Sequence, residues 1–267
     1  MAVSAARLAI VGGGKMGEAL LAGLLGAQWA RAEDMIVVEP VEARRKELAA
    51  TFVDVDVTAE PMQSDGAVIA VKPNDVEGAC RAVAEAGVQR VLSIAAGVPL
   101  ARLERWIGDG TPVVRAMPNT AALVGAGAAA IAAGTWAGED ELAWAESILG
   151  AVGIVQRVGE PLLDAVTGLS GSGPAYVFLV AEALTEAGVL AGLPRPTAQA
   201  LVVQTLLGSA RMLAETGKSA EEHRAAVTSP GGTTAAGLRA LESRGVRSAF
   251  IEAVWEATVR SKELGRD

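Results

Sequence analysis

The 267-residue chain contains very few of the residues that metal sites and disulfide bonds require. It has one cysteine, Cys80, and one histidine, His223. A single cysteine excludes a disulfide bond or a thiolate zinc site within one chain, and it fits a reducing compartment. His223 lies in the charged run E-E-H-R, where we expect it to face solvent. The sequence therefore predicts no metal site and a cytoplasmic location.

Aromatic residues and positive charge are also scarce. Aromatic residues make up 3% of the chain although 51% of it is hydrophobic, so small apolar residues dominate and elements can approach closely. The formal net charge is −8 at pH 7, which argues against nucleic acid or an anionic membrane as the main partner. Small anions remain suitable ligands where backbone N–H groups, rather than a basic patch, bind them.

We expect neither a signal peptide nor a membrane-spanning helix. The first ten residues have no charged segment followed by a long apolar one. The stretch 116–138 carries no charge, but it contains Pro118, Asn119, Thr120 and four glycines. This composition provides too little hydrophobicity for a membrane span.

A glycine-rich motif follows the apolar run 8–11. Gly12, Gly14 and Gly17 fit the pattern G-x-G-x-x-G, and residues 18–25 continue with the apolar spacing of a helix. Between a strand and a helix, the first glycine permits the turn and the second admits a pyrophosphate to the backbone. The third lets the helix pack on the strand. The anion would lie at the helix N-terminus, and the alternative is a glycine-rich turn with no ligand.

The second apolar run, 35–38, ends at Glu39. An acidic residue about 20 residues past the glycines usually binds the ribose 2′-hydroxyl of NAD. Arg44 and Arg45 follow closely and would suit the 2′-phosphate of NADP, unless they lie on a solvated helix face. The sequence therefore leaves NADH and NADPH open.

Apolar runs alternate with helical segments through the first 160 residues. We expect further strands at 66–71, 90–94, 113–117, 128–132 and 153–158, with a helix at 140–149. Continuous apolar runs are typical of parallel strands that are covered on both faces. The alternation predicts an α/β fold, with a Rossmann-like doubly wound sheet in a first domain, 1–160.

Strand signals end after Val158, so the sequence predicts a second, all-helical domain over 161–267. Its central helix, 175–190, carries only two charged residues, Glu182 and Glu186, and must be covered nearly all round. We expect Pro174 in its first turn, with Ser170 and Ser172 as caps. Further helices are expected at 195–216, 235–242 and 250–263. A domain this apolar is hard to bury alone, which predicts a homodimer built on the helical half.

The segment 228–234, T-S-P-G-G-T-T, precedes one of these helices. Its hydroxyl groups, proline and two glycines make a helix start that is rich in free N–H groups. Such a start can bind a carboxylate without a guanidinium group. The alternative is a capped helix with no ligand.

These segments resemble the pyrroline-5-carboxylate reductase family. The resemblance is carried by V-G-G-G-K-M-G-E-A-L at 11–20, A-V-K-P at 70–73, A-A-G-V at 95–98, R-A-M-P-N-T at 115–120, D-A-V-T-G-L-S-G-S-G-P-A-Y at 164–176 and V-T-S-P-G-G-T-T at 227–234. They span nearly the whole chain in the family's order. The resemblance implies an NAD(P)H-binding Rossmann domain and a helical dimerisation domain, in dimers that often assemble into rings of five.

The resemblance also implies a reaction and its residues. The reaction is hydride transfer from NADPH or NADH to the C=N bond of 1-pyrroline-5-carboxylate, giving L-proline, with Thr234 as the catalytic donor to the imine nitrogen. The substrate would be bound by Glu160, Ser229, Gly231, Gly232, Thr233 and Thr234. The cofactor would be bound by Gly12, Gly14, Lys15, Met16, Gly17, Glu39, Val71, Lys72, Pro73, Ala95, Ala96, Gly97 and Asn119. The chain departs from the family at Glu39, often a small polar residue, and at Val57, often an asparagine.

Other functions remain open from the residues alone. A β-hydroxyacid dehydrogenase shares the two-domain plan, but it commonly takes its base from a lysine on the long second-domain helix. The five lysines of this chain, at 15, 46, 72, 218 and 262, all lie outside the central helix. A non-catalytic dinucleotide-binding protein and a structural oligomer are further alternatives. Glu160 has a second interpretation as a surface carboxylate, and Tyr176 fits core packing better than proton donation.

Overall fold

The computed structural model describes residues 8–265, which form two compact units. Within the described residues, the first unit is 8–172 together with 256–265, and the second is Gly173–Trp255. The last described strand ends at Arg157, and only helices follow it among the described residues. We predict the end of the strands after Val158, one residue later. By contacts, however, the helical residues after 160 and the end of the last helix pack with the sheet. Residues 1–7, over which we expect no signal peptide, lie outside the described residues.

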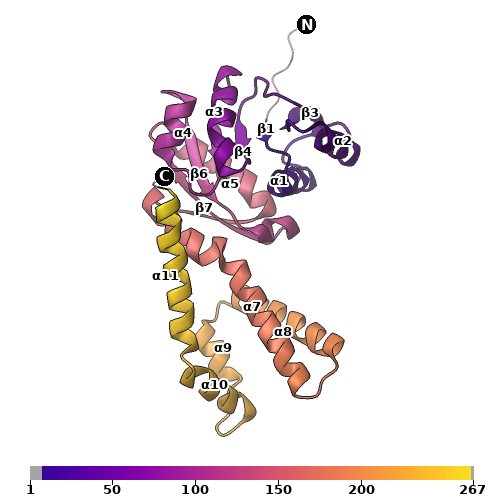
Figure 1. Cartoon of the computed structure of the whole chain (residues 1–267), viewed down its shortest axis with the longest axis vertical. Helices are drawn as coiled ribbons and strands as arrows, with labels where there is room; N and C mark the ends of the chain where they lie inside the picture. The colour runs from indigo at the N-terminus through magenta and orange to yellow at the C-terminus, as the bar shows by residue number, and fades with distance from the viewer. Residues whose placement is uncertain (1–7, 266–267) are drawn as a thin grey trace. The chain divides into compact units, whose positions relative to one another are not determined.

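Eight strands form a single sheet in the first unit (Figure 1), in the order β3-β2-β1-β4-β5-β6-β7-β8. The strands are β1 (Leu8–Val11), β2 (Met35–Val38), β3 (Asp56–Thr58), β4 (Ala67–Ile69), β5 (Val91–Ser93), β6 (Val113–Met117), β7 (Gly127–Ala133) and β8 (Gly153–Arg157). The doubly wound sheet is confirmed. One strand pair differs from the prediction: β6 and β7 are antiparallel. Only residues 118–126 separate them, which is too short for a parallel crossover.

Helices cover both faces of this sheet. They are α1 (Lys15–Gly26), α2 (Glu42–Thr51), α3 (Val76–Glu85), α4 (Leu100–Ile107) and α5 (Glu139–Leu149). Alternate residues of β1 belong to two separate cores: Leu8 and Ile10 pack in the core with α1 and α5, and Ala9 and Val11 in the core with α3 and α4. Cys80 of α3 is buried in the second core, and burial raises the pKa of its thiol to about 12. This thiol is inert at neutral pH.

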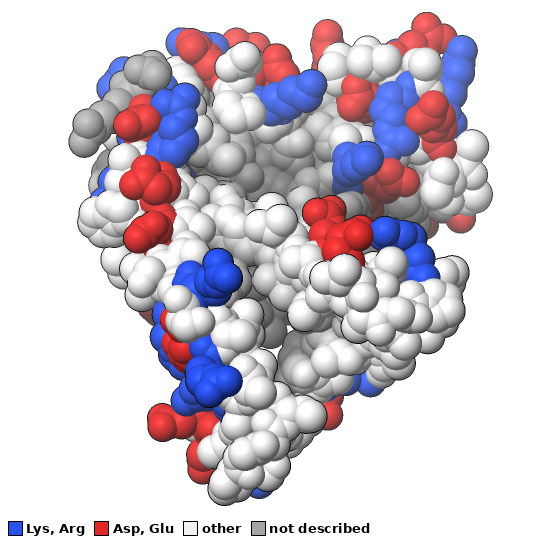
Figure 2. All heavy atoms as spheres, turned by 60° about the horizontal axis from the view of Figure 1, so that its bottom comes forward, with Lys and Arg blue, Asp and Glu red and all other residues white. Residues whose placement is uncertain are grey.

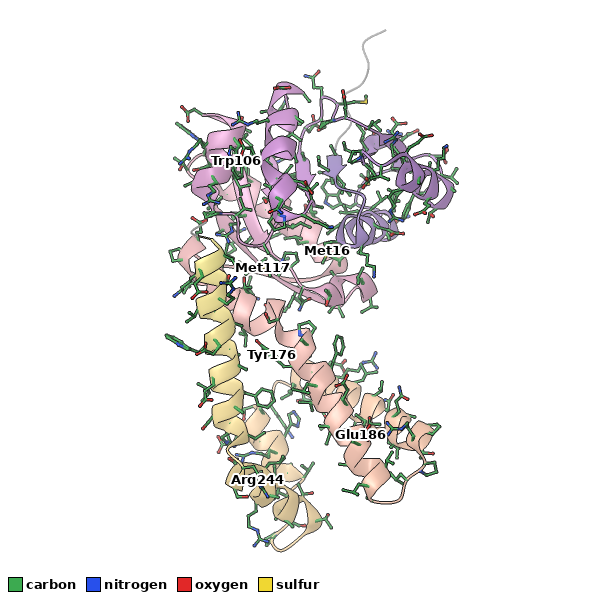
Figure 3. The ribbon with its side chains drawn as sticks, in the orientation of Figure 1. Met16, Trp106, Met117, Tyr176, Glu186 and Arg244 are labelled. Atoms are coloured by element: carbon green, nitrogen blue, oxygen red, sulfur yellow. The ribbon has the colours of Figure 1, made fainter. Side chains whose placement is uncertain are left out.

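Pro174 lies in the first turn of the central helix, as the sequence predicts, but the backbone before that helix is already helical. Helix α6 (Leu163–Val166) and a π-helical turn, Thr167–Gly171, lead directly into α7 (Gly173–Leu190). Met117 lies close to this turn (Figure 3), since a Cβ on Gly171 would be 2.6 Å from the Met117 Cε. The stretch Glu160–Leu190 is long and apolar enough to cross a membrane. Only 6% of its most apolar segment is buried within the chain, so this segment is not covered by the rest of the protein. A helix that packs on a second copy passes the same test of length and composition.

A side-chain donor replaces the backbone N–H that Pro174 lacks. Pro174 has no N–H to donate to the carbonyl oxygen of Ser170, four residues earlier. Asn119 Nδ2 donates to this oxygen at 3.0 Å instead. The Ser170 hydroxyl donates to the carbonyl oxygen of Val166 at 3.1 Å, so it does not cap α7. The helix therefore continues through the proline.

The second unit is helical and buries little of its own surface. Its helices are α7, α8 (Arg195–Glu215), α9 (Ala220–Ala226), α10 (Thr233–Ser243) and the first part of α11 (Val246–Leu264). Thr185 and Ala198 are the only buried residues described between 173 and 255. Phe178 and Ile251 are 63% and 70% exposed. In Figure 2 the molecule is turned so that the lower end of the Figure 1 view comes forward. Broad areas of uncharged side chains are visible on this unit. Such a surface needs a partner.

Candidate active site

Glycine shapes the turn between β1 and α1. Gly12 has a φ of +112°, and a Cβ there would lie 2.6 Å from the carbonyl oxygen of Ala70. A Cβ on Gly17 would collide with the carbonyl oxygen of Gly12. Both positions therefore require glycine, as the motif predicts. A Cβ on Gly14 would meet no described atom within 4 Å, so the space beside it is open.

This open space lies at a helix N-terminus. Gly14 is the N-cap residue of α1, with extended backbone, and its N-terminus has no side-chain cap among the described residues. Lys15 and Met16 form the start of the first turn, and Met16 is labelled in Figure 3. The N–H groups of this turn and the helix dipole favour an anion. The turn thus has both the room and the donors for the pyrophosphate of a dinucleotide.

Glu39 is held beside the same turn. It directly follows β2 and is 9% exposed. Its Oε2 accepts a hydrogen bond from the backbone N–H of Gly13 at 3.1 Å, and its Oε1 accepts one from Val41 at 2.9 Å. The carboxylate therefore has a fixed place next to the glycine turn. Sequence reasoning finds Glu39 but misses the two amides, because neither carries a side-chain signal.

The residues that follow β4 and β5 come together at the carboxyl edge of the sheet. The two strands pair in parallel, and β4 also pairs with β1, so the residues Val71, Lys72, Pro73, Ala95, Ala96 and Gly97 share the edge that holds the glycine turn. A cavity of about 610 Å³ opens there. The sheet edge contributes Pro73, Ala96 and Gly97 to its lining, and the helices contribute Thr167 and Arg260. The edge provides room for a ligand where open α/β sheets bind one.

Asn119 is used within the protein at both ends of its side chain. Its Nδ2 donates to Ser170 and its Oδ1 accepts from the N–H of Ala128 at 3.1 Å. These bonds join the start of β7 to the π-helical turn. The structure gives Asn119 a structural role, and its contact with the cofactor stays a prediction.

Glu160 also has partners inside the first unit. Its Oε1 accepts from the backbone N–H of Leu100, at the start of α4, at 2.6 Å. The same oxygen pairs with Arg115 at 2.9 Å, and the Arg115 side chain is 11% exposed. Glu160 thus neutralises a nearly buried guanidinium group and a helix N-terminus. Glu160 therefore has structural partners in this unit, and its contact with the substrate stays a prediction.

We expect Glu160→Gln to lower the free energy of unfolding by about 1–3 kcal/mol, because Arg115 then keeps its charge without a carboxylate partner. Urea unfolding measures the loss. The matched control is Glu77→Gln, which breaks the exposed pair of Glu77 with Arg81 and should cost below about 0.5 kcal/mol. Unchanged stability together with a raised KM for the substrate would instead assign Glu160 to substrate binding.

The predicted carboxylate-binding segment forms a tight turn at the start of α10. Gly231 has a φ of +71°, which favours glycine. A Cβ on Gly232 would collide with the Ser229 hydroxyl, so that hydroxyl lies against the turn. Gly232 is the N-cap residue, no described side chain caps the helix, and Thr233 and Thr234 form its first turn. The segment presents backbone N–H groups and hydroxyls in the second unit, as the sequence predicts.

Comparisons with known proteins agree with this geometry. Residues 160–264 match the family described as pyrroline-5-carboxylate reductase dimerisation, and residues 7–97 match the family described as NADP oxidoreductase, coenzyme F420-dependent. The chain is 48% identical to the pyrroline-5-carboxylate reductase of Synechocystis, over 97% of this chain and 98% of that protein.

Solved structures give the same result over the whole length. A pyrroline-5-carboxylate reductase from Coxiella burnetii superposes with a TM-score of 0.92 and 36% identity, covering 98% of this chain and 99% of that one. The Plasmodium falciparum pyrroline carboxylate reductase with NADP bound superposes with a TM-score of 0.84 and 29% identity, covering 97% and 98%. With a glycine turn after β1 and a dimerisation match over residues 160–264, this chain belongs to the pyrroline-5-carboxylate reductase family.

Proposed function

We propose that this protein reduces 1-pyrroline-5-carboxylate to L-proline, the last step of proline biosynthesis, with NADPH or NADH. The observation that carries the proposal is the uncapped start of α10, where Ser229 lies against a turn formed by Gly231 and Gly232. The substrate has one carboxylate, which such a turn binds through backbone N–H groups. The glycine turn after β1 fits the pyrophosphate of the second substrate.

When bound, the reduced nicotinamide supplies the hydride that adds to the C=N carbon. The chain has to hold the imine in one orientation and provide a hydrogen-bond donor at its nitrogen. The N–H groups of residues 231–233 bind the carboxylate, with Ser229 assisting, and the Thr234 hydroxyl donates to the nitrogen. An iminium carbon is already electrophilic, so orientation provides most of the rate enhancement. Lysine and histidine are absent from α7, in keeping with a reaction that needs no strong base.

The test is a reaction of the purified protein with pyrroline-5-carboxylate and each reduced dinucleotide. We expect loss of NAD(P)H absorbance and formation of L-proline in equal amounts. A 3-hydroxy acid with NAD serves as the comparison for a β-hydroxyacid dehydrogenase. Turnover of the hydroxy acid alone, or dinucleotide binding without any turnover, would contradict the proposal.

We also propose that the dimers assemble into rings of five and that the protein acts in the cytoplasm. The exposed apolar side chains of α7, α8 and α11 support an assembly built on the helical unit. A buried thiol as the only cysteine supports a reducing compartment. Light scattering on the purified protein measures the assembly: a mass of ten chains is expected, and a mass of two chains would restrict it to the dimer.

A further inference from the structure

The end of β2 offers very few hydrogen-bond donors to a phosphate group. Pro40 has no N–H, and the N–H of Val41 already donates to Glu39 at 2.9 Å. Helix α2 then begins with Glu42, whose carboxylate pairs with Lys46 at 2.7 Å. A phosphate is bound by several N–H or guanidinium donors, so this segment is poorly suited to one.

The carboxylate of Glu39, in contrast, suits hydroxyl groups. The amides of Gly13 and Val41 hold one oxygen each, and each carboxylate oxygen can accept a further hydrogen bond. In a dinucleotide-binding turn of this type, the acidic residue after the second strand accepts from the ribose 2′-hydroxyl. A 2′-phosphate at the same place would bring about −1.5 to −2 charges against the carboxylate.

The two nearby arginines are engaged in the protein. Arg44 donates from Nε to the carbonyl oxygen of Gly13 at 2.8 Å, and its terminal nitrogens pair with Glu18 at 2.6 Å and Glu47 at 3.0 Å. Hydrogen bonds to Glu18 and Glu47 raise the pKa of the Arg44 guanidinium above its usual value. Arg44 therefore braces the glycine turn and already has carboxylate partners.

Arg45 braces the end of the strand. Its NH1 group donates to the carbonyl oxygens of Glu39 and Pro40, at 2.9 and 2.7 Å. These contacts fix the backbone that carries the Glu39 carboxylate. To bind a 2′-phosphate, either arginine would have to share or give up contacts that shape the turn.

We propose that Glu39 makes this protein select NADH over NADPH, by accepting from the ribose 2′-hydroxyl and repelling a 2′-phosphate. The proposal rests on the proposed function and names the cofactor of that same site. It separates this chain from the Plasmodium relative whose structure holds NADP. In the sequence, Glu39 favours NADH, whereas Arg44 and Arg45 would suit NADPH. Because both arginines already bind groups within the protein, the structure favours the role of Glu39.

The first measurement needs only the unmodified protein and no turnover. Calorimetric titration compares NADH with NADPH, and 5′-AMP with adenosine 2′,5′-bisphosphate, which differ only in the 2′-phosphate. We expect Kd values at least about 10-fold lower for the ligand without the 2′-phosphate in each pair, as one unfavourable charge pair at a partly solvated site predicts. Equal affinities, or tighter binding of NADPH, would overturn the proposal.

The second measurement uses Glu39→Gln, which removes the charge and keeps the shape. We expect the preference for NADH to fall about 10-fold, mainly because NADPH binds more tightly. The matched control is Glu85→Gln, at the exposed end of α3. Because α3 returns from the end of β4 to the start of the parallel β5, Glu85 lies toward the opposite edge of the sheet and should leave both Kd values unchanged.

Two outcomes keep the proposal distinct from the function it rests on. If Glu39→Gln folds and its preference for NADH is unchanged, the proposal fails even where the protein makes proline. If the protein prefers NADH in titrations but reduces pyrroline-5-carboxylate with neither dinucleotide, the selectivity is supported and the proposed function fails. Should Glu39→Gln not fold, the comparison of 5′-AMP with its 2′-phosphorylated form still decides the matter.

Discussion

Replacing Thr234 by alanine is expected to lower kcat by about 10- to 100-fold, the usual cost of losing one donor to the transition state. Thr234 lies in the first turn of α10, directly after the turn that we assign to the substrate carboxylate. We propose that its hydroxyl donates to the imine nitrogen. Dinucleotide affinity should stay unchanged, because the glycine turn of the first unit is untouched. Steady-state kinetics and calorimetric titration measure the two effects.

Two further variants make this result specific. Thr234→Ser keeps the hydroxyl and should retain most of the turnover. Thr228→Ala removes a hydroxyl from the same segment, but that hydroxyl donates to the carbonyl oxygen of Arg224 at 2.6 Å, so kcat should be retained. If Thr234→Ala turned over as fast as the unmodified protein, the Thr234 hydroxyl would not be the donor at the imine nitrogen.

The second large effect is a split between binding and stability at two glycines of the same motif. Gly14→Ala should raise the Kd for either dinucleotide about 100-fold, because a methyl group would occupy the open space beside Gly14 and break charge-assisted hydrogen bonds to the pyrophosphate. Its thermal midpoint should hardly change, since that methyl group meets no described atom within 4 Å and the backbone φ of −70° suits alanine.

Gly17→Ala should behave in the opposite way. Its methyl group collides with the carbonyl oxygen of Gly12, which we expect to cost about 1–3 kcal/mol of stability, or more if the turn cannot move. Gly26→Ala, in the last turn of the same helix, has open space around it and serves as the control for both variants. Thermal unfolding and titration distinguish them. A stable Gly17→Ala, or a Gly14→Ala that binds dinucleotide normally, would contradict this view of the turn.

Much of the fold follows from local signals in the sequence. The apolar runs at 8–11 and 35–38 are the strands β1 and β2 with those bounds. The antiparallel join of β6 and β7 could have been inferred from the nine residues between them, 118–126. The start of helix α9 could also have been inferred, because Ser219 and Glu222 have the spacing of a capping box, which they form in the structure.

The details of the site depend on contacts that no local pattern reveals. The role of Glu160 requires α4 to begin at Leu100, 60 residues away, and Arg115 to point toward it. The helical course through Pro174 depends on Asn119, which lies 51 residues before its partner Ser170. Residue types predict the glycine turn and Glu39, whereas the packing of distant segments decides which groups remain for a ligand.

The scarcity of buried residues in Gly173–Trp255 couples folding to mass action. A helical unit that buries little within one chain gains most of its hydrophobic stabilisation only when a second copy associates. Its unfolding equilibrium therefore depends on protein concentration, whereas the sheet has its own closed cores. On dilution, the helices of this unit should therefore lose structure before the nucleotide-binding half does. The start of α10 at Thr233 then stays folded only while the concentration of chains is high enough for two copies to associate.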